Sequence, residues 1–166
     1  MAFSLVPDYM FKTFDMANAD FLEKIGVRGI VLDIDNTLEP YENAHPGEHV
    51  VKWLQSLDER GIKASIVSNN NSERVKIFNK SLGLPAYAKG GKPFKKNVLR
   101  AMRDMGTDAK STALMGDQIF TDVWAARNAG IRAILVPPIK DKRDLFTRFK
   151  RLLERGIIKK YEKRKI

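Results

Sequence analysis

Residues 27–37 read VRGIVLDIDNT, an almost continuous apolar run that ends in two aspartates. A run of this kind is typical of a strand that is buried on both faces of a parallel sheet. Side chains two residues apart point to the same side of a strand, so Asp33 and Asp35 share one pocket, roughly 7 Å apart at the backbone. Acids at the end of a buried strand are costly unless they are paired, hydrogen-bonded or metal-bound. They indicate either a functional site or capping of the following loop.

Short apolar runs alternate with helical patterns along the rest of the chain. The predicted strands are residues 27–35, 62–68, 86–88, 112–116 and 132–136. The predicted helices are residues 47–60, one from Asn71 or Ser72 to about 82, one opened by Pro93 and ended by Gly106, and one that runs to about 129. This alternation predicts an α/β fold: a Rossmann-like, doubly wound parallel sheet of five strands with helices on both faces and a ligand site at the carboxyl ends of the strands.

Polar clusters follow the later strands in the same way. Ser68 and Asn69 end the second strand within SNN, and Asp117 ends the fourth, five residues before Asp122. Between them, GGKP supplies Lys92 as a fixed cation, beside glycines that let the backbone approach a ligand closely. Each cluster alone is more often a loop or a helix cap. Their order at successive strand ends favours one shared site.

This motif series resembles that of the haloacid dehalogenase-like (HAD) superfamily, from DIDNT through SNN and KP to GDQIFTD over residues 27–136. The resemblance implies a phosphatase in which Asp33 is the nucleophile and forms an aspartyl-phosphate. It makes Asp35 the general acid and base, a role that phosphoester hydrolysis needs and dehalogenation does not. Lys92 would neutralise the nucleophile and the phosphoryl oxygens, with Asp122 orienting it.

The resemblance also implies how phosphate and metal are bound. Asn36, Ser68, Asn69 and Lys92 would bind the transferring phosphate. Mg²⁺ would be held by a carboxylate oxygen of Asp33, the backbone carbonyl of Asp35 and Asp117, which are the oxygen donors that this hard ion prefers. A cation is expected on physical grounds too, because an anionic nucleophile cannot approach a phosphate dianion until charge is neutralised.

Composition bounds the remaining possibilities. The chain has 166 residues and no cysteine, which favours one domain (1–166) without disulfides or thiolate metal sites. It shows neither a signal peptide nor a membrane-spanning run, so a cytoplasmic location is expected. Residues 140–166 hold twelve Lys and Arg against four Asp and Glu, and so carry most of the net charge of +10. A zinc site at His45 and His49 is disfavoured, because Pro46 and Gly47 interrupt the segment.

The two ends of the chain flank the predicted catalytic core at 27–136. Residues 1–26 are predicted to be helical, with four apolar side chains that either cover the sheet or form a docking surface: Phe11, Phe14, Phe21 and Leu22. Residues 140–166 are predicted to form a basic amphipathic helix, which either lies on an anionic membrane or packs on the core. Its apolar stripe is Leu145, Phe146, Phe149, Leu152 and Leu153.

No cap domain fits between Asn36 and Ser65 or between Asn70 and Lys92, so an open site is expected. Within the superfamily the chain resembles the capless subfamily IIIA and its YqeG-type branch, through VPDYMFKTF, IVLDIDNTLEPY, SNNN, AKGGKPF and GDQIFTDVWAARNAGI. That branch is similar to phosphatases that convert phosphatidylglycerophosphate to phosphatidylglycerol. The resemblance therefore implies this anionic phospholipid as substrate, and the basic C-terminal segment would allow peripheral association with the inner face of the membrane.

Two alternatives stay open. One is a phosphatase of a small soluble phosphate ester. The other is an RNA- or ribosome-associated binding protein, which the basic tail permits, although the sequence has no specific nucleic-acid motif beyond charge.

Overall fold

The computed structural model describes residues 3–140 and 145–164. Its centre is one parallel sheet in the order β1-β6-β5-β2-β3-β4. The strands are β1 (Tyr9–Met10), β2 (Gly29–Leu32), β3 (Lys63–Val67), β4 (Ala86–Tyr87), β5 (Thr112–Gly116) and β6 (Arg132–Leu135). The α/β class, the parallel sheet and the five expected strands are confirmed.

The sheet has a sixth strand that the sequence did not predict. β1 is only two residues long and pairs with β6 through Tyr9 opposite Ile134. So short a segment, two residues after Pro7, shows no alternating pattern. Tertiary contacts hold it instead: the Arg127 guanidinium donates to the carbonyls of Ser4 and Val6 and to the Asp8 carboxylate.

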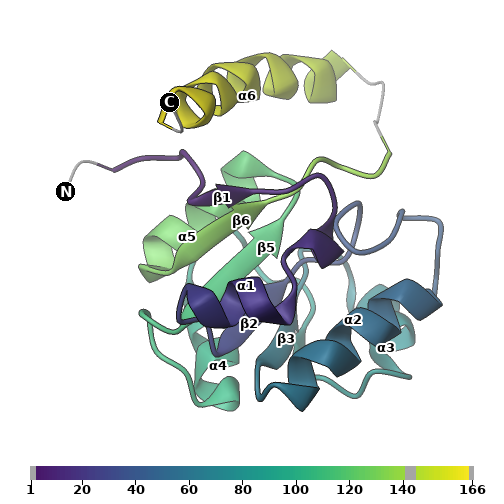
Figure 1. Ribbon diagram of the computed structural model, residues 1–166. Coiled ribbons are helices and arrows are strands. Elements are labelled where there is room, and N and C mark those ends of the chain that lie inside the picture. Colours follow the sequence, from purple (N-terminus) through teal and green to yellow (C-terminus); the bar gives the residue numbers. More distant parts are fainter. Residues whose placement is uncertain (1–2, 141–144, 165–166) are drawn as a thin grey trace.

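Helices cover both faces of the sheet (Figure 1). They are α1 (Ala19–Lys24), α2 (Glu48–Glu59), α3 (Ser72–Asn79), α4 (Lys96–Met105), α5 (Trp124–Ala129) and α6 (Leu145–Arg164), with a 3₁₀ turn at Phe14–Met16 and a π-helical turn, η2, at Ile119–Val123. Because side chains alternate along a strand, Ile30 and Leu32 pack with α1, α2 and α3, whereas Val31 packs with α4 and α5. The core is thus two apolar layers.

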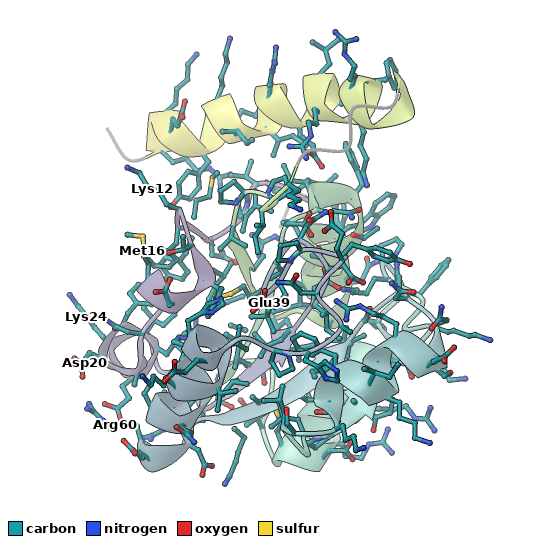
Figure 2. The ribbon with its side chains drawn as sticks, turned by 90° about the vertical axis from the view of Figure 1, so that its right-hand side faces the viewer. Lys12, Met16, Asp20, Lys24, Glu39 and Arg60 are labelled. Atoms are coloured by element: carbon teal, nitrogen blue, oxygen red, sulfur yellow. The ribbon has the colours of Figure 1, made fainter. Side chains whose placement is uncertain are left out.

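The N-terminal segment covers the first of these layers. Phe14 and Leu22 are buried in it, and Phe11 and Phe21 pack against it. Arg60, at the end of α2, forms ion pairs with Asp20 and Glu23 of α1. Figure 2 labels Arg60 and Asp20 on the same side of the molecule. Of the two interpretations of the N-terminal aromatics, covering of the sheet is the one confirmed. The predicted helix over residues 1–26 is found only in part, as a 3₁₀ turn and α1, because Tyr9–Met10 pair with β6 as a strand.

The helix after GGKP begins later than predicted. α4 starts at Lys96 rather than at Pro93, and the Phe94 amide closes a turn onto the Gly91 carbonyl. The reason is tertiary, because the Asn69 side chain bonds both the amide and the carbonyl of Lys92, at 2.8 and 2.9 Å. By contrast, Asn71 caps α3 as predicted, with its side chain accepting from the Arg74 amide.

α6 lies across the β1 end of the sheet, above the N-terminal segment (Figure 1). Ile157 and Ile158 pack against the second layer, and the buried Tyr161 accepts a hydrogen bond from the Met10 amide. The predicted stripe is not the packed face: Phe149, Leu152 and Leu153 are 50–61% exposed. Glu154 and Tyr161 fix which face of α6 packs on the protein. Apolar periodicity could not predict this face, because the side chains that fix it are polar. The side chains of residues 145–147, and all of 141–144 and 165–166, lie outside the described part.

Candidate active site

The site lies at the carboxyl ends of three neighbouring strands. Asp33 follows β2, Ser68 follows β3 and Asp117 follows β5. A pocket of about 510 Å³ opens there. It is lined by Asp33, Asp35, Asn36, Tyr41, Ser68, Asn69, Asn70, Asp117, Gln118, Lys140, Lys150, Arg151 and Glu154. The convergence predicted from the order of the motifs is what the fold produces.

Lys92 forms the charged centre of the site. Its ammonium lies 2.9 Å from Asp33 Oδ1 and 2.6 Å from Asp122 Oδ1, and all three residues are buried. Burial lowers the pKa of Lys92, but the attraction of Asp122 and Asp33 outweighs it, so the pKa lies above its ordinary value. Lys92 therefore stays positive. Burial raises the pKa of Asp33 to about 6, against the lowering effect of Lys92.

Asp122 is held so that it can support this lysine. Its second oxygen, Oδ2, accepts from the Gln118 amide at 3.0 Å. Gly116 makes room for it, because a Cβ at that position would lie 2.1 Å from Asp122 Cγ. Both carboxylate oxygens are thus engaged by the protein.

Asp117 joins the cluster through Thr37. The buried Thr37 hydroxyl lies 3.3 Å from Asp33 Oδ2 and 3.2 Å from Asp117 Oδ1, and so can donate to either carboxylate. Burial, with repulsion from Asp122 and Asp33, raises the pKa of Asp117 to about 8. Among the described residues, Asp33, Asp117 and Asp122 form the one group with carboxylate oxygens within 4.8 Å of one another. Buried oxygen donors with raised pKa values fit a hard divalent cation.

The Asp35 side chain faces two partners that the sequence did not identify. Asn70 Nδ2 donates to Asp35 Oδ2 at 2.9 Å, and Arg74 Nε donates to Oδ1 at 3.0 Å. Arg74 is itself fixed by the Ala44 carbonyl and lies over the rings of Tyr41 and Phe78. Arg74 lies in the first turn of α3, just after SNN, and this position is the signal from which its role could have been inferred.

Three of the residues predicted to bind phosphate, Asn36, Ser68 and Asn69, differ in the hydrogen bonds that their side chains make. Asn36 has a left-handed backbone, φ 61°, and its buried Oδ1 has no hydrogen-bond partner. Ser68 is buried, with its hydroxyl accepting from the Asn70 amide at 3.1 Å. Asn69 lines the pocket, but both ends of its amide bond the Lys92 backbone. The Asn69 side chain thus positions Lys92, while its role toward phosphate stays a prediction.

α6 contributes to the pocket, which the sequence did not predict. Lys150 donates to Gln118 Oε1 at 2.6 Å, and Glu154 Oε1 accepts from the Ile119 amide at 3.3 Å. Burial raises the pKa of Glu154 above its usual range. These contacts tie α6 to the loop after β5. No local signal reveals them, because the face that a terminal helix presents depends on the whole fold.

His49 lies apart from the carboxylate cluster. Its ring packs beside Phe14, and its Nε2 is 3.4 Å from Glu39 Oε1. The buried Glu39 also accepts from the Gly47 amide and from Asn43. Gly47 and His49 thus both contact Glu39.

Fold and site together define an α/β enzyme with a buried lysine–carboxylate centre at the strand ends. A family model described as haloacid dehalogenase-like hydrolase matches residues 7–136. The curated "Probable phosphatase YqeG" of Bacillus subtilis (strain 168) is 37% identical over 153 residues, 92% of this chain and 89% of that protein. The chain belongs to the haloacid dehalogenase-like hydrolase family.

Solved structures share the fold at low sequence identity. A HAD-superfamily hydrolase from Ehrlichia chaffeensis aligns with TM-score 0.56 and 18% identity, over 77% of this chain and 98% of that one. The cobalt-bound deoxy-D-mannose-octulosonate 8-phosphate phosphatase (YrbI) from Haemophilus influenzae aligns with TM-score 0.56 and 15% identity, over 85% and 91%. These structures confirm the predicted fold, and the family model and the Bacillus subtilis relative confirm the predicted superfamily.

Insertions large enough for a cap domain are absent from residues 3–140. Between β2 and β3 the chain forms a loop and α2, and between β3 and Lys92 it forms α3 and β4. Over 3–140 and 145–164, no helix is long and apolar enough to cross a membrane.

Proposed function

We propose that this chain is a phosphatase that hydrolyses phosphate monoesters through an aspartyl-phosphate on Asp33. The observation that carries the proposal is the buried Lys92 ammonium between Asp33 and Asp122, at 2.9 and 2.6 Å. It gives an anionic nucleophile a fixed positive neighbour at the point where phosphoryl charge develops. The description of the Bacillus subtilis relative as a probable phosphatase supports the same chemistry.

Mg²⁺ is the cofactor proposed for the carboxylate cluster. Asp33 and Asp117, linked through Thr37, would hold it together with the backbone carbonyl of Asp35. Asp122 is reserved for Lys92, because both of its oxygens are already engaged. When bound, the ion supplies positive charge that offsets repulsion between the phosphate and the acids of the pocket.

The reaction runs in two displacements. A carboxylate oxygen of Asp33 attacks phosphorus, the bond from phosphorus to the ester oxygen breaks, and Asp35 gives its proton to the departing alkoxide. Asp35 then takes a proton from water, whose oxygen attacks phosphorus, so that inorganic phosphate leaves and the Asp33 carboxylate is restored. Asn70 and Arg74 hold Asp35 at the pocket wall during this exchange.

Release of phosphate from para-nitrophenyl phosphate tests this chemistry. We expect turnover with Mg²⁺, none with a chelator, and background rates for Asp33→Asn. Brief incubation with a substrate carrying labelled phosphate, followed by an acid quench, should leave the label on the wild-type chain. Full activity of folded Asp33→Asn would contradict the proposal.

For the substrate, we propose phosphatidylglycerophosphate in a membrane surface. Three observations support a lipid: residues 3–140 contain no insertion large enough for a cap domain, Lys150 and Arg151 of α6 line the pocket, and the same helix exposes Phe149, Leu152 and Leu153. A helix that offers both apolar and basic side chains suits an anionic lipid surface.

A panel of esters distinguishes this lipid from a small soluble substrate. Phosphatidylglycerophosphate in vesicles should be hydrolysed with a much higher kcat/KM than soluble sugar or nucleotide phosphates. If a soluble ester is turned over well while the lipid is untouched, the lipid assignment fails and the phosphatase assignment stands.

A further inference from the structure

The cations at the active site fall into two groups, of which only the second lines the pocket. Those near the catalytic acids are already used, because Lys92 pairs with Asp33 and Asp122, and Arg74 pairs with Asp35. A second group lines the same pocket from the C-terminal part of the chain, where Lys140, Lys150 and Arg151 stand with one acid, Glu154. Lys92, whose side chain is only 1% exposed, supports the transferred phosphate from behind Asp33, whereas the second group lines the pocket itself. The second group is in excess of what that phosphate needs.

We propose that Lys150 and Arg151 form an anion-binding subsite for a second phosphate of the substrate, distinct from the phosphate that is transferred. This inference rests on the proposed phosphatase function and adds to it the residues that would recognise a leaving group carrying a further phosphate, whether the ester is a lipid or soluble. Arginine and lysine are the usual partners of phosphate oxygens, and such charge-assisted bonds are among the stronger ones.

The subsite is built on a helix that is fixed in place. Glu154, only 9% exposed, accepts from the Ile119 amide, and Lys150 bonds Gln118 in the loop that also carries Asp117. Eleven positions after Lys150, Tyr161 anchors the far part of α6 to the Met10 amide. Side chains held on a docked helix can select a ligand by position rather than by charge alone.

The pocket has room for such a substrate. Its volume of about 510 Å³ lies in the range of pockets that enclose a whole small ligand, and it runs from Asp33 to residues of α6. Lys140 takes a lesser part, because it is paired with Glu42 at 3.0 Å and both side chains are 60% exposed. The half-buried Lys150 and Arg151 therefore define the subsite.

Two sources offer this second phosphate, and both would make the same contacts. One is the phosphodiester of a phospholipid headgroup, and the other is the second phosphate of a soluble bisphosphate. Two soluble esters measure the effect of the second phosphate alone, because propane-1,3-diyl bisphosphate and 3-hydroxypropyl phosphate differ only in that group. Phosphatidylglycerophosphate in vesicles adds the lipid arm.

The experiment compares kcat/KM for these substrates in wild type, Lys150→Ala, Arg151→Ala and Lys159→Ala. Lys159 is the matched control, since it is an exposed lysine of the same helix that does not line the pocket. We expect Lys150→Ala and Arg151→Ala each to lower kcat/KM for the bisphosphate by about tenfold or more, chiefly through KM, as loss of a charge-assisted bond requires. The monophosphate should lose far less, and Lys150→Arg should restore part of the preference.

A purely structural role of these residues would reduce both soluble esters equally, and that result would overturn the inference. So would an equal loss in Lys159→Ala, which would indicate general electrostatic attraction. A selective loss confined to vesicles assigns the second phosphate to a lipid headgroup, and one confined to the bisphosphate assigns it to a soluble substrate.

Calorimetric titration of Asp33→Asn with the two soluble esters separates this inference from the proposed function. The subsite is supported if Asp33→Asn binds the bisphosphate more tightly than the monophosphate and Asp33→Asn/Lys150→Ala does not. This holds even if neither ester is hydrolysed. Equal binding of both esters, with no selective loss in vesicles, overturns it even if the protein proves to be an active phosphatase.

Discussion

Lys92 determines whether the buried acids of the site can coexist. Its ammonium contacts two of them, and its side chain is only 1% exposed. We expect Lys92→Met to lower phosphate release by at least about a hundredfold and to destabilise the fold by about 3–5 kcal/mol, because buried carboxylates lose their counter-charge. Urea unfolding and phosphate release measure the two effects. Lys96→Met, an exposed lysine at the start of α4, is the control and should change neither; unchanged stability in Lys92→Met would contradict this account.

Asp117 should make the stability of the metal-free protein depend on pH. Burial raises its pKa from 3.8 to about 8, so the folded state binds a proton that the unfolded state has already lost at intermediate pH. The stabilising effect of this proton is complete below pH 4 and is lost as pH rises through 8. In chelator, the free energy of unfolding of wild type should therefore fall between pH 5 and pH 8 relative to Asp117→Asn.

Added Mg²⁺ should reverse that trend, because it favours the ionised carboxylates. The gain in melting temperature on adding Mg²⁺ should be larger at pH 8 than at pH 5. If the free energies of unfolding of wild type and Asp117→Asn change equally with pH in chelator, Asp117 does not titrate in this range.

α3 connects the SNN cluster after β3 to Asp35, which follows β2. Asn71 caps the helix, and this sets Arg74 within reach of Asp35. We expect Arg74→Met to lower kcat by about tenfold to a hundredfold with little change in KM, because Asp35 loses its orientation while the phosphate ligands are untouched. Steady-state kinetics on para-nitrophenyl phosphate measure this. Arg100→Met, an exposed arginine of α4, should behave as wild type; a rise in KM alone for Arg74→Met would contradict a role through Asp35.

The elements that could be predicted are those with local signals. The buried strands β2 and β5 are continuous apolar runs, and α3 has its asparagine cap. The start of α4 could not be predicted, since it depends on Asn69 binding the Lys92 backbone across the site. The two-residue β1 likewise depends on the distant Arg127.

In the candidate site, too, residues with a local sequence signal could be predicted and residues placed by tertiary contacts could not. The acids and the lysine were predictable because each follows a strand, and parallel strands end at one edge of the sheet. The partners that orient them were not, because Thr37, Asn70 and Arg74 carry no pattern of their own. The pocket residues of α6 depend on how the last helix docks, which is a property of the whole chain.

α6 has one face that packs on the protein and another that is exposed. One face, with Glu154, Ile157, Ile158 and Tyr161, packs on the protein. Another exposes Phe149, Leu152 and Leu153, three and four residues apart, amid basic residues of the same helix. Residues at this spacing lie on one side of a helix. An exposed apolar strip beside a cationic pocket suits docking on an anionic membrane.

We therefore expect the protein to bind vesicles that contain phosphatidylglycerol, and to bind them less in high salt. Replacing Phe149, Leu152 and Leu153 together with serine should weaken binding at least about tenfold in a sedimentation assay, because each lost apolar side chain removes about 1 kcal/mol or more of burial. Phe94→Ser is the control: Phe94 is 74% exposed but precedes α4, so its loss should not matter. The triple variant should still hydrolyse para-nitrophenyl phosphate, since these side chains do not line the pocket. Vesicle binding that persists in the triple variant and vanishes only when basic residues are removed would assign docking to charge alone, and equal binding to neutral vesicles would rule out the anionic surface as its partner.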